Sequence, residues 1–560
     1  MAVLDRRARG PEPTTAKHRK PARHAKTTDP GAPPAGVSPA AAQVRAPASA
    51  SPAASPLVLP VPPHDREKYS YVRRHSWVLT VCMLLTFPPL VYSQIKMFQD
   101  SRWFLLYAPF MAFGTLCFLL SLVVDGLSRS FDLRAHERVV ATWRPLWYPS
   151  VDIFMPTCGE PIEILRNSWS HVDALRRQYQ GPVTPYVLDD AARPEVRAMA
   201  REFGFAYANR PNRGWFLKSG NLRWGFKVSA GEYILLLDAD FAPRPDTLAE
   251  TLPYMDMYPD VGIVQTPQFF HVDDDQTWVE RGAGSIQELF YRSIQTARAS
   301  KNGAICVGSC ALYRRSALTQ NDGMSLAHHS EDIHTGFDLY LLGWRLVYLP
   351  IAFSTGNCPD NVGAFVNQQY RWCSGTMSLL GDRKFWRAKV PLYTRLCYLS
   401  GCVGYIYTAV FTFVAPMLAI GMLVFGPNYL LLKNMIFVAP VLFYAGVIYP
   451  MWHRSPYRLE AWAVRVLSGW AHAFAFFDHL RGNMRGWQAS GSATRQDGRR
   501  RLWVGLVGWS FASSALWAGL AFWRMMTMDA YNFFLIFVLG VFQLVVVGRI
   551  LIQPKASEPI

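Results

Sequence analysis

Acidic residues follow two apolar runs in this chain, at positions where they could bind a cation. The run 233–237 leads into Asp238 and Asp240, which are separated by a single residue. Another apolar run ends at Asp189-Asp190. An unpaired carboxylate next to a buried strand is costly, so such acids usually meet a cation or a hydrogen-bond donor. An Asp-x-Asp sequence offers two hard oxygen ligands that suit Mg²⁺ or Mn²⁺ bridging a diphosphate. A lone Asp-x-Asp more often forms a turn or cap, but the other acidic clusters favour Asp238 and Asp240 as metal ligands.

Further groups suited to the same chemistry lie elsewhere in the middle of the chain. Arg371 could pair with a phosphate through two hydrogen bonds, and Trp372 could stack on a sugar ring. Arg-Trp is equally an ordinary anchor at a membrane surface. Lys218 could add positive charge beside a phosphate, or it could be a solvated lysine at the start of a helix. A third acidic cluster, Ser330-Glu331-Asp332, lies between Lys218 and Arg371 in the sequence.

Strands that alternate with helices would position these groups. Strands are expected at 151–155, 186–188 and 233–237, with a helix at 194–203. This alternation predicts an α/β fold with a parallel sheet covered on both faces. Ligands of an open parallel sheet bind beyond the carboxyl ends of the strands, where Thr157, Asp189 and Asp238 would fall. The polar clusters are therefore expected to converge on one crevice.

Six apolar windows are candidates for membrane-spanning helices, since most approach the roughly 20 apolar residues needed to cross a bilayer core. The windows are residues 77–91, 103–124, 404–425, 430–449, 502–522 and 533–552. The segment 459–480 is also apolar, but it carries Glu460, Arg465 and Asp478. Such a mixture suits an interfacial helix better than a span.

Basic residues near the ends of the windows predict the topology, because loops rich in Lys and Arg tend to stay in the cytoplasm. Arg73-Arg74 precede the first window, and Arg499-Arg500-Arg501 precede the fifth. A topology of two spans, a cytoplasmic domain and four further spans keeps these basic residues in the cytoplasm. It also places both termini there. The expected parts are a disordered tail at 1–63, two spans within 64–128, a catalytic domain at 129–395 with interfacial helices near 365–395, and four spans within 396–560 with an interfacial helix near 459–480 and a loop near 483–498.

The N-terminal segment is basic and poor in residues that build a core. The chain of 560 residues has a formal net charge of +17, and residues 1–74 hold 13 Arg or Lys against 5 Asp or Glu. Their Pro/Ala-rich composition predicts disorder. A cytoplasmic leader near anionic lipid explains the charge better than a nucleic-acid-binding arm, so we expect no nucleic-acid partner. The nine cysteines are scattered without metal spacing and are expected to be reduced thiols.

Taken in order, these motifs resemble the processive, membrane-embedded family 2 glycosyltransferases, in particular the catalytic subunit of bacterial cellulose synthase. The resemblance runs from about residue 151 to residue 372, with similar predicted spans around it. The pieces that carry it occur in the family's order: Pro156-Thr157-Cys158-Gly159-Glu160, Val187-Leu188-Asp189-Asp190, Lys218-Ser219-Gly220-Asn221, Asp238-Ala239-Asp240, Val264-Gln265-Thr266-Pro267, Gly308-Ser309-Cys310, Ser330-Glu331-Asp332 and Gln368-Gln369-Tyr370-Arg371-Trp372.

The resemblance implies a Rossmann-like domain that binds a nucleotide sugar, and a role for each matching residue. Asp332 would be the general base. The donor would be bound by Thr157, Glu160, Asp189, Asp190, Lys218, Asp238, Gln368 and Arg371. The acceptor would be bound by Gly308, Ser309 and Trp372, and Mg²⁺ or Mn²⁺ by Asp238 and Asp240. Direct displacement at the anomeric carbon needs a base for the acceptor proton and cations for the leaving diphosphate.

The chain departs from the family pattern in three places. The usual Thr-Glu-Asp is Ser330-Glu331-Asp332 here, which keeps the base. The gating loop, roughly Phe-x-Val-Thr-x-Lys in the family, is matched only by Trp487 to Ser492, which lacks the Lys. Many bacterial cellulose synthases append a cyclic-di-GMP-binding barrel. The last expected span ends close to Ile560, so we expect no barrel and interpret the Arg-x-x-x-Arg at 454–458 as a basic interfacial loop.

The resemblance implies a processive inverting enzyme that builds a β-linked polysaccharide, most simply a glucan from UDP-glucose, and passes it across the bacterial inner membrane. Its partners would be the nucleotide sugar, the growing polysaccharide, the lipid bilayer and accessory export subunits. A synthase of the chitin, hyaluronan or mannan type, or an enzyme that adds one sugar to a lipid phosphate, would use the same acidic clusters. A nucleotide-binding transporter is disfavoured, because charges inside the membrane usually mark a transport path and the six windows contain almost none.

Overall fold

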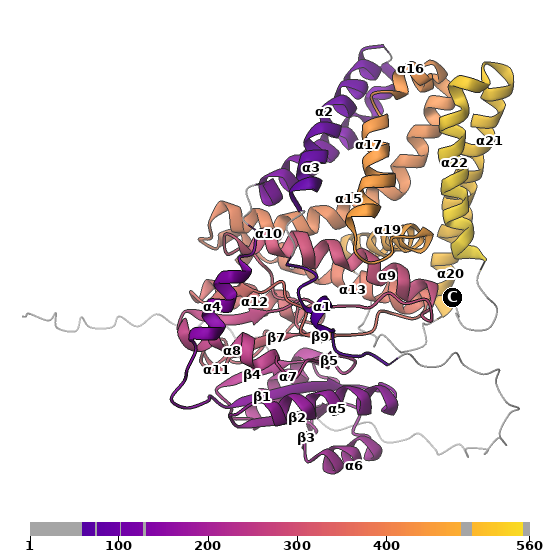
Figure 1. Cartoon of the computed structure of the whole chain (residues 1–560). Coiled ribbons are helices and arrows are strands. Elements are labelled where there is room, and N and C mark those ends of the chain that lie inside the picture. Colours follow the sequence, from indigo (N-terminus) through magenta and orange to yellow (C-terminus); the bar gives the residue numbers. More distant parts are fainter. Residues whose placement is uncertain (1–58, 73–75, 101, 127–129, 483–495, 553–560) are drawn as a thin grey trace, which may run out of the picture. The chain divides into compact units, whose positions relative to one another are not determined.

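The computed structural model describes residues 59–72, 76–100, 102–126, 130–482 and 496–552, all within one compact unit (Figure 1). Most of the predicted tail and the loop from Trp487 to Ser492 lie outside the described residues. The end of the predicted tail lies inside them. The carbonyl oxygen of Pro60 accepts a 2.7 Å hydrogen bond from Asn167, and that of Pro63 accepts one of 2.6 Å from Arg244. Residues 59–63 are therefore bound to the folded unit.

A mixed sheet of seven strands, in the order β3-β2-β1-β4-β7-β6-β8, forms the centre of the α/β domain. Neighbouring strands pair in parallel except at β7, which is antiparallel to both β4 and β6. The predicted α/β class is confirmed, but the expectation of a wholly parallel sheet is wrong. The chain crosses the carboxyl end of β4 just before β7, so β7 enters the sheet from that edge and runs backwards. The strands are β1 (Val151–Thr157), β2 (Val183–Asp189), β3 (Ala206–Ala208), β4 (Tyr233–Leu236), β6 (Val261–Gln265), β7 (Ala311–Arg314) and β8 (Arg345–Tyr348).

Both faces of the sheet are buried, as expected for a sheet between two layers of helices. On β1, Ile153 and Met155 belong to one hydrophobic core, and Phe154 belongs to the core on the opposite face. Burial on both faces explains why the strand, apart from Asp152, reads as an apolar run. The first face is covered by α5 (Ile162–Gln178), α6 (Pro194–Phe203) and α8 (Thr247–Met257), and the second by α7 (Leu217–Val228), α11 (Arg315–Gln320) and α12 (Glu331–Leu341).

A second sheet of two strands follows the Asp-Ala-Asp sequence directly. Strand β5 (Ala242–Pro243) begins two residues after Asp240 and pairs antiparallel with β9 (Ser354–Thr355). Phe269 bridges to Thr355 on the same strand. This small sheet connects segments that are more than a hundred residues apart in the sequence.

Three helices join the α/β domain to the apolar helices. They are α9 (Trp278–Leu289), α13 (Val362–Gly381) and α19 (Leu459–Leu480), and α19 packs against both of the others (Figure 1). It also packs against α15 (Leu392–Phe425) and α22 (Ala530–Leu551). Both α13 and α19 therefore pack against helices that could cross a membrane.

The charged residues of α19 have partners within the protein. Asp478 pairs with Arg501 at 2.9 Å, and Glu460 pairs with Arg281 at 3.1 Å. The helix is buried along much of its length and is not among the described helices that have the length and composition of a span. Packing between helices thus accounts for an apolar segment that contains charges.

Five helices within the described residues are long and apolar enough to cross a membrane: Trp77–Gln99, Arg102–Val124, Leu392–Phe425, Arg500–Thr527 and Ala530–Leu551. The predicted window at 430–449 differs, because the apolar helix there is the shorter Ala439–Trp452. It contains Pro440 and Pro450, and a π-helical turn precedes Pro450. A proline has no N–H to donate within a helix, which interrupts regular α-helix at this point. The remaining helices named in Figure 1 include α1 (Asp65–Lys68), α2 (Ser76–Asp100), α3 (Ala108–Gly126), α4 (Leu133–Thr142), α10 (Gln295–Ala299), α16 (Leu432–Met435), α17 (Ala439–Phe443), α20 (Gln496–Gly505) and α21 (Ala512–Thr527).

Candidate active site

Asp238 and Lys218 form the centre of the site, at the carboxyl end of β4. The Nζ atom of Lys218 lies 2.5 Å from Oδ1 of Asp238 and 3.6 Å from Oε1 of Glu331. The backbone N–H of Asp238 donates a 2.8 Å hydrogen bond to Oγ of Ser309. Burial lowers the pKa of Lys218, but the charges of Asp238 and Glu331 outweigh burial and raise it above its ordinary value. Lys218 is therefore a charged group between two of the acidic clusters.

The turn before α7 fixes the position of Lys218. Phe216 and Leu217 both have positive φ, at 48° and 49°, a conformation that costs energy for residues with a side chain. The fully buried Arg210 holds this turn by donating to the carbonyl oxygens of Trp215 and Leu217. A Cβ atom on Gly220 would collide with the carbonyl oxygen of Trp215. The family motif that begins at Lys218 is thus a compact helix start that only a glycine at its third position allows.

Asp240 is the second carboxylate of the Asp-Ala-Asp sequence. Burial and the charge of Asp238 raise the pKa of Asp240 to about 7, although a hydrogen bond from the backbone of Asn357 lowers it. Two carboxylates this close disfavour each other's charge, and a divalent cation would relieve that repulsion. Among the described residues, no group of three or more His, Cys, Asp or Glu side chains could hold a metal by itself. Asp238 and Asp240 are therefore the two described carboxylates that would hold a divalent cation, with further ligands from outside the protein.

Asp332 lies in the first turn of α12 and faces Gly308. Its Oδ1 accepts a 2.8 Å hydrogen bond from the N–H of Ile333. A Cβ atom on Gly308 would lie 3.2 Å from Oδ2 of Asp332, so the backbone of Gly308 runs directly against the carboxylate. Burial, and then the charge of Glu331, raise the pKa of Asp332 to about 7, while Lys218 lowers it. A carboxylate with this pKa can accept a proton efficiently near neutral pH.

Gln265, at the end of β6, shapes the loop that carries Gly308 and Ser309. Its Nε2 donates a 2.9 Å hydrogen bond to the carbonyl oxygen of Ser309, and its Oε1 accepts one of 3.0 Å from the N–H of Val307. Gly308 has φ +83°, which favours glycine, and Cys310 also has a positive φ of 57°. The predicted acceptor loop is therefore held in shape by a buried amide from a neighbouring strand.

Helix α13 brings Arg371 to the same site. Burial lowers the pKa of Arg371 below its ordinary value, and the negative charges of Asp238 and Glu331 partly offset this by raising it. Gln368, one turn earlier, has a buried Oε1 atom with no hydrogen-bond partner among the described residues. Trp372 is half-buried beside Arg371.

Gly375 sets the distance between α13 and the start of α12. A Cβ atom on Gly375 would collide with the side chain of Ser330, the residue that caps α12. The helix that carries Arg371 and Trp372 is therefore in direct contact with the turn that carries Asp332. A side chain at position 375 would push the two apart.

Asp189 ends β2 and Asp190 follows it, and both side chains are bound by groups of the chain itself. The fully buried Asp189 accepts hydrogen bonds from the N–H groups of Ala191 (3.0 Å) and Arg193 (2.8 Å) and from the hydroxyl of Tyr207 (2.9 Å). Asp190 forms a two-point ion pair with Arg210, with N–O distances of 2.6 and 2.7 Å. Both carboxylates shape the loops around the site. Their predicted contact with a nucleotide stays a prediction.

Thr157, Glu160 and Arg193 lie beside these acids. Oε2 of Glu160 accepts a 2.7 Å hydrogen bond from the N–H of Cys158, and its carbonyl oxygen accepts one of 2.6 Å from Nη1 of Arg193. Oγ1 of Thr157 and both Nε and Nη2 of Arg193 are buried without a hydrogen-bond partner among the described residues. Buried donors left unpaired cost free energy, so this group suits a polar ligand.

The sequence reasoning missed Arg193, Arg210 and Asn357. Arg193 directly precedes Pro194 at the start of a predicted helix, and that position could have drawn attention to it. Arg210 and Asn357 act through contacts with Asp190 and Asp240 that are distant in the sequence, so no local pattern marks them. By contrast, the structure does bring together the predicted residues Lys218, Asp238, Asp240, Gly308, Ser309, Asp332 and Arg371.

The comparisons with known proteins point to one family. Residues 233–452 match the sequence profile of glycosyl transferase family group 2. Cellulose synthase 1 of Komagataeibacter xylinus is 30% identical over 332 residues, which are 58% of this chain and 20% of that protein. The UDP-forming cellulose synthase catalytic subunit of Pseudomonas fluorescens is 30% identical over 293 residues, which are 52% of this chain and 39% of that protein. The chain thus matches less than half the length of these relatives.

Solved structures give a weaker likeness. The mannosyltransferase from Pyrobaculum calidifontis in complex with GDP-Man and Mn²⁺ superimposes with a TM-score of 0.44 at 16% identity, covering 66% of this chain and 99% of that chain. Residues 233–452 therefore match a family 2 glycosyltransferase domain, and the chain is a homologue of the bacterial cellulose synthase catalytic subunits.

Proposed function

We propose that this protein is a processive, inverting glycosyltransferase that polymerises a β-linked glucan from UDP-glucose and passes the product across the bacterial inner membrane. The observation that carries the proposal is the meeting of Lys218, Asp238, Asp332 and Arg371 at one edge of the sheet. The helix that carries Arg371 also packs against α15 and α19, so a product made here would form next to apolar helices.

In the proposed reaction, an acceptor hydroxyl attacks the anomeric carbon of the donor. The new C–O bond forms as the bond to the diphosphate breaks, and Asp332 takes the hydroxyl proton. Lys218 and Arg371 stabilise the negative charge that develops on the leaving diphosphate. Asp238 and Asp240 would hold Mg²⁺ or Mn²⁺, which supplies further positive charge to that diphosphate when bound. Displacement from the opposite side inverts an α-linked donor to a β-linked product.

The other groups of the site would orient the two substrates. The unpaired atoms of Thr157 and Arg193 suit the nucleoside of the nucleotide sugar, because each can donate a hydrogen bond to an oxygen of that nucleoside. Trp372 would stack on the acceptor sugar, and Gly308 leaves room for it beside the base. The cytoplasmic placement of this domain, the export of the polymer and any accessory subunits are parts of the same proposal.

The test is to supply the full-length protein in lipid nanodiscs with UDP-glucose and Mg²⁺ or Mn²⁺, and to measure UDP release and product length. Polymer that linkage analysis identifies as a β-glucan supports the proposal. A single sugar per acceptor would instead favour an enzyme that glycosylates a lipid phosphate, and polymer only from another nucleotide sugar would favour a different synthase. Absence of transfer from UDP-glucose, UDP-N-acetylglucosamine and GDP-mannose alike would rule out the function.

The pH dependence of sugar transfer should follow the ionisation of Asp332. Its pKa is raised to about 7, and it must be ionised to accept a proton, so kcat/KM is expected to fall about tenfold per pH unit below about pH 7. The assay should use saturating Mn²⁺, because Asp240 also titrates at about 7 and a bound cation displaces its proton. A profile that stays flat from about pH 5.5 to about pH 8 under these conditions would contradict the role of Asp332.

A further inference from the structure

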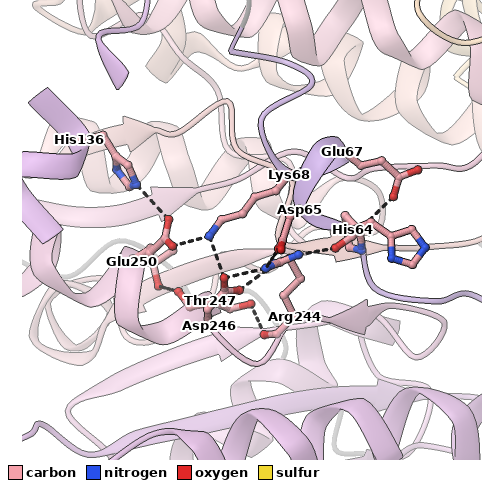
Figure 2. Close-up of polar contacts among 11 residues, drawn as sticks. His64, Asp65, Glu67, Lys68, His136, Arg244, Asp246, Thr247 and Glu250 are labelled. Atoms are coloured by element: carbon pink, nitrogen blue, oxygen red, sulfur yellow. Dashed lines mark hydrogen bonds and ion pairs between the residues drawn. The ribbon is translucent and has the colours of Figure 1, made fainter. Parts of the chain in front are cut away.

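The segment 59–72, which we call the N-terminal strap, precedes the first apolar helix and is bound to the α/β domain. Figure 2 shows its Lys68 between Glu250 and Asp246, with Arg244 beside Asp65. Farther along the strap, Tyr71 is buried in the main hydrophobic core. The strap is therefore anchored by both ion pairs and apolar packing.

Lys68 is the central contact of the strap. Its side chain is only 6% exposed, and its Nζ lies 2.7 Å from Oδ2 of Asp246 and also pairs with Glu250. Burial lowers the pKa of Lys68, but hydrogen bonds to both carboxylates raise it above its ordinary value, so the side chain is charged. A buried lysine without such partners would be strongly unfavourable. The charge on Lys68 thus requires both acids to stay in place.

The strap contacts residues next to both strands of the small sheet. The carbonyl oxygen of Lys68 accepts a 2.8 Å hydrogen bond from the N–H of Ala352, two residues before β9. Arg244 directly follows β5, and it binds Pro63 and Asp65 of the strap as well as Asp246. The N–H of Arg244 also donates to the carbonyl oxygen of Phe353, at 2.7 Å.

The same two strands set the position of Asp240. Strand β5 begins two residues after it, and β9 leads into Gly356 and Asn357, whose backbone forms a hydrogen bond with the Asp240 carboxylate. A Cβ atom on Gly356 would collide with the ring of Phe241, so the two segments are in tight contact. A displacement of either strand would therefore move the Asp240 carboxylate.

We propose that Lys68 is a positioning residue for the metal site, which holds β5 and β9 together and thereby fixes Asp240 in the orientation that binds the cation. The proposal rests on the function proposed above for Asp238 and Asp240. It also assigns a role to the strap, which ties the first apolar helix, starting at Ser76, to the catalytic domain next to its metal ligands.

Three variants of the full-length protein separate this role from general stability. Lys68→Met removes the charge and keeps the apolar stem, and Lys68→Arg restores a charge that can bridge both acids. Arg166→Met is the matched control, because Arg166 forms an ion pair with Glu202 in which both side chains are more than half exposed, at 51% and 57%. Binding of Mn²⁺ is measured by electron paramagnetic resonance in the presence of UDP, with the melting temperature and sugar transfer recorded separately.

Lys68→Met is expected to weaken Mn²⁺ binding by roughly 10-fold, the lower end of what supporting partners contribute at metal sites. Lys68→Arg should recover most of the affinity, and Arg166→Met should bind like the wild type. A lower melting temperature with unchanged Mn²⁺ affinity in Lys68→Met would overturn the proposal, since the residue would then serve stability alone. If the wild type binds Mn²⁺ and UDP but transfers no sugar, the proposed function fails while the weakened binding still supports the positioning role.

Discussion

Replacing Asp332 by asparagine is expected to reduce sugar transfer by roughly 10²–10⁴-fold, the usual contribution of a positioned general base. The amide keeps the shape of the carboxyl group and its place in the first turn of α12, but it cannot take the proton of the acceptor hydroxyl. The measurement is UDP release at saturating donor and Mn²⁺. Binding of UDP should change little, because Asp332 is not a donor ligand in this mechanism.

Stability gives an independent check on the Asp332 variant. Burial and the charge of Glu331 raise the pKa of Asp332 in the folded protein to about 7, well above the ordinary value of an aspartate, so the folded state favours the protonated form. The contribution of Asp332 to stability is therefore lost as the pH rises through about 7, where the buried carboxyl group becomes charged. Asparagine stays neutral and avoids the cost of burying that charge. We expect the melting temperature at pH 8 to stay the same or to rise.

Asp338→Asn is the matched control, since Asp338 lies on the same helix but pairs with Lys384 at 2.6 Å. It should retain most of the transfer activity. Equal losses in the two variants would mean that any acid-to-amide change on α12 disturbs the site, and would remove the argument for Asp332 as the base.

Replacing Asp240 by asparagine is expected to raise the Mn²⁺ concentration for half-maximal binding by more than about 100-fold, because changes to supporting partners alone cost 10–100-fold at metal sites. The variant loses one of the two carboxylates that fit the cation, while the Lys218–Asp238 pair remains. Titration of Mn²⁺ in the presence of UDP measures the change. Transfer should fall in parallel and recover in part at high Mn²⁺.

Asp260→Asn provides the comparison for Asp240. Asp260 precedes β6 at the opposite edge of the sheet and pairs with Arg345 at 2.8 Å, with more than half of its side chain exposed, at 57%. Its replacement should leave Mn²⁺ binding unchanged. A metal requirement that is the same in Asp240→Asn and in the wild type would exclude Asp240 as a ligand.

The sequence allowed the prediction of much of the sheet and of the edge at which several candidate site residues lie. Strands buried on both faces read as apolar runs, and parallel strands place the residues after them at one edge, so Asp238 and Thr157 were located correctly. The direction of β7 could not be predicted, because a short apolar strand carries no information about its neighbours. The roles of Asp189 and Asp190 in shaping loops were equally hidden, since their partners Tyr207 and Arg210 have no recognisable spacing.

The apolar helices were predicted less evenly. Five of the windows have matching long helices, but the apolar helix at 430–449 is the shorter Ala439–Trp452, which has Pro440 in its first turn and a π-helical turn before Pro450. The strap was missed because composition suggested only a basic leader. Lys68 and Asp246 are 178 residues apart in the sequence, and no local pattern predicts a contact over that separation.

The contact between Gly375 and Ser330 has a mechanical consequence. Nothing separates the two helices at this point, so α13 cannot tilt without carrying the start of α12 along. A tilt of α13 would then move the carboxylate of Asp332 together with the side chains of Arg371 and Trp372. Because α13 also packs against α15 and α19, a movement of those helices would alter the binding of the donor diphosphate and the transfer of the acceptor proton together.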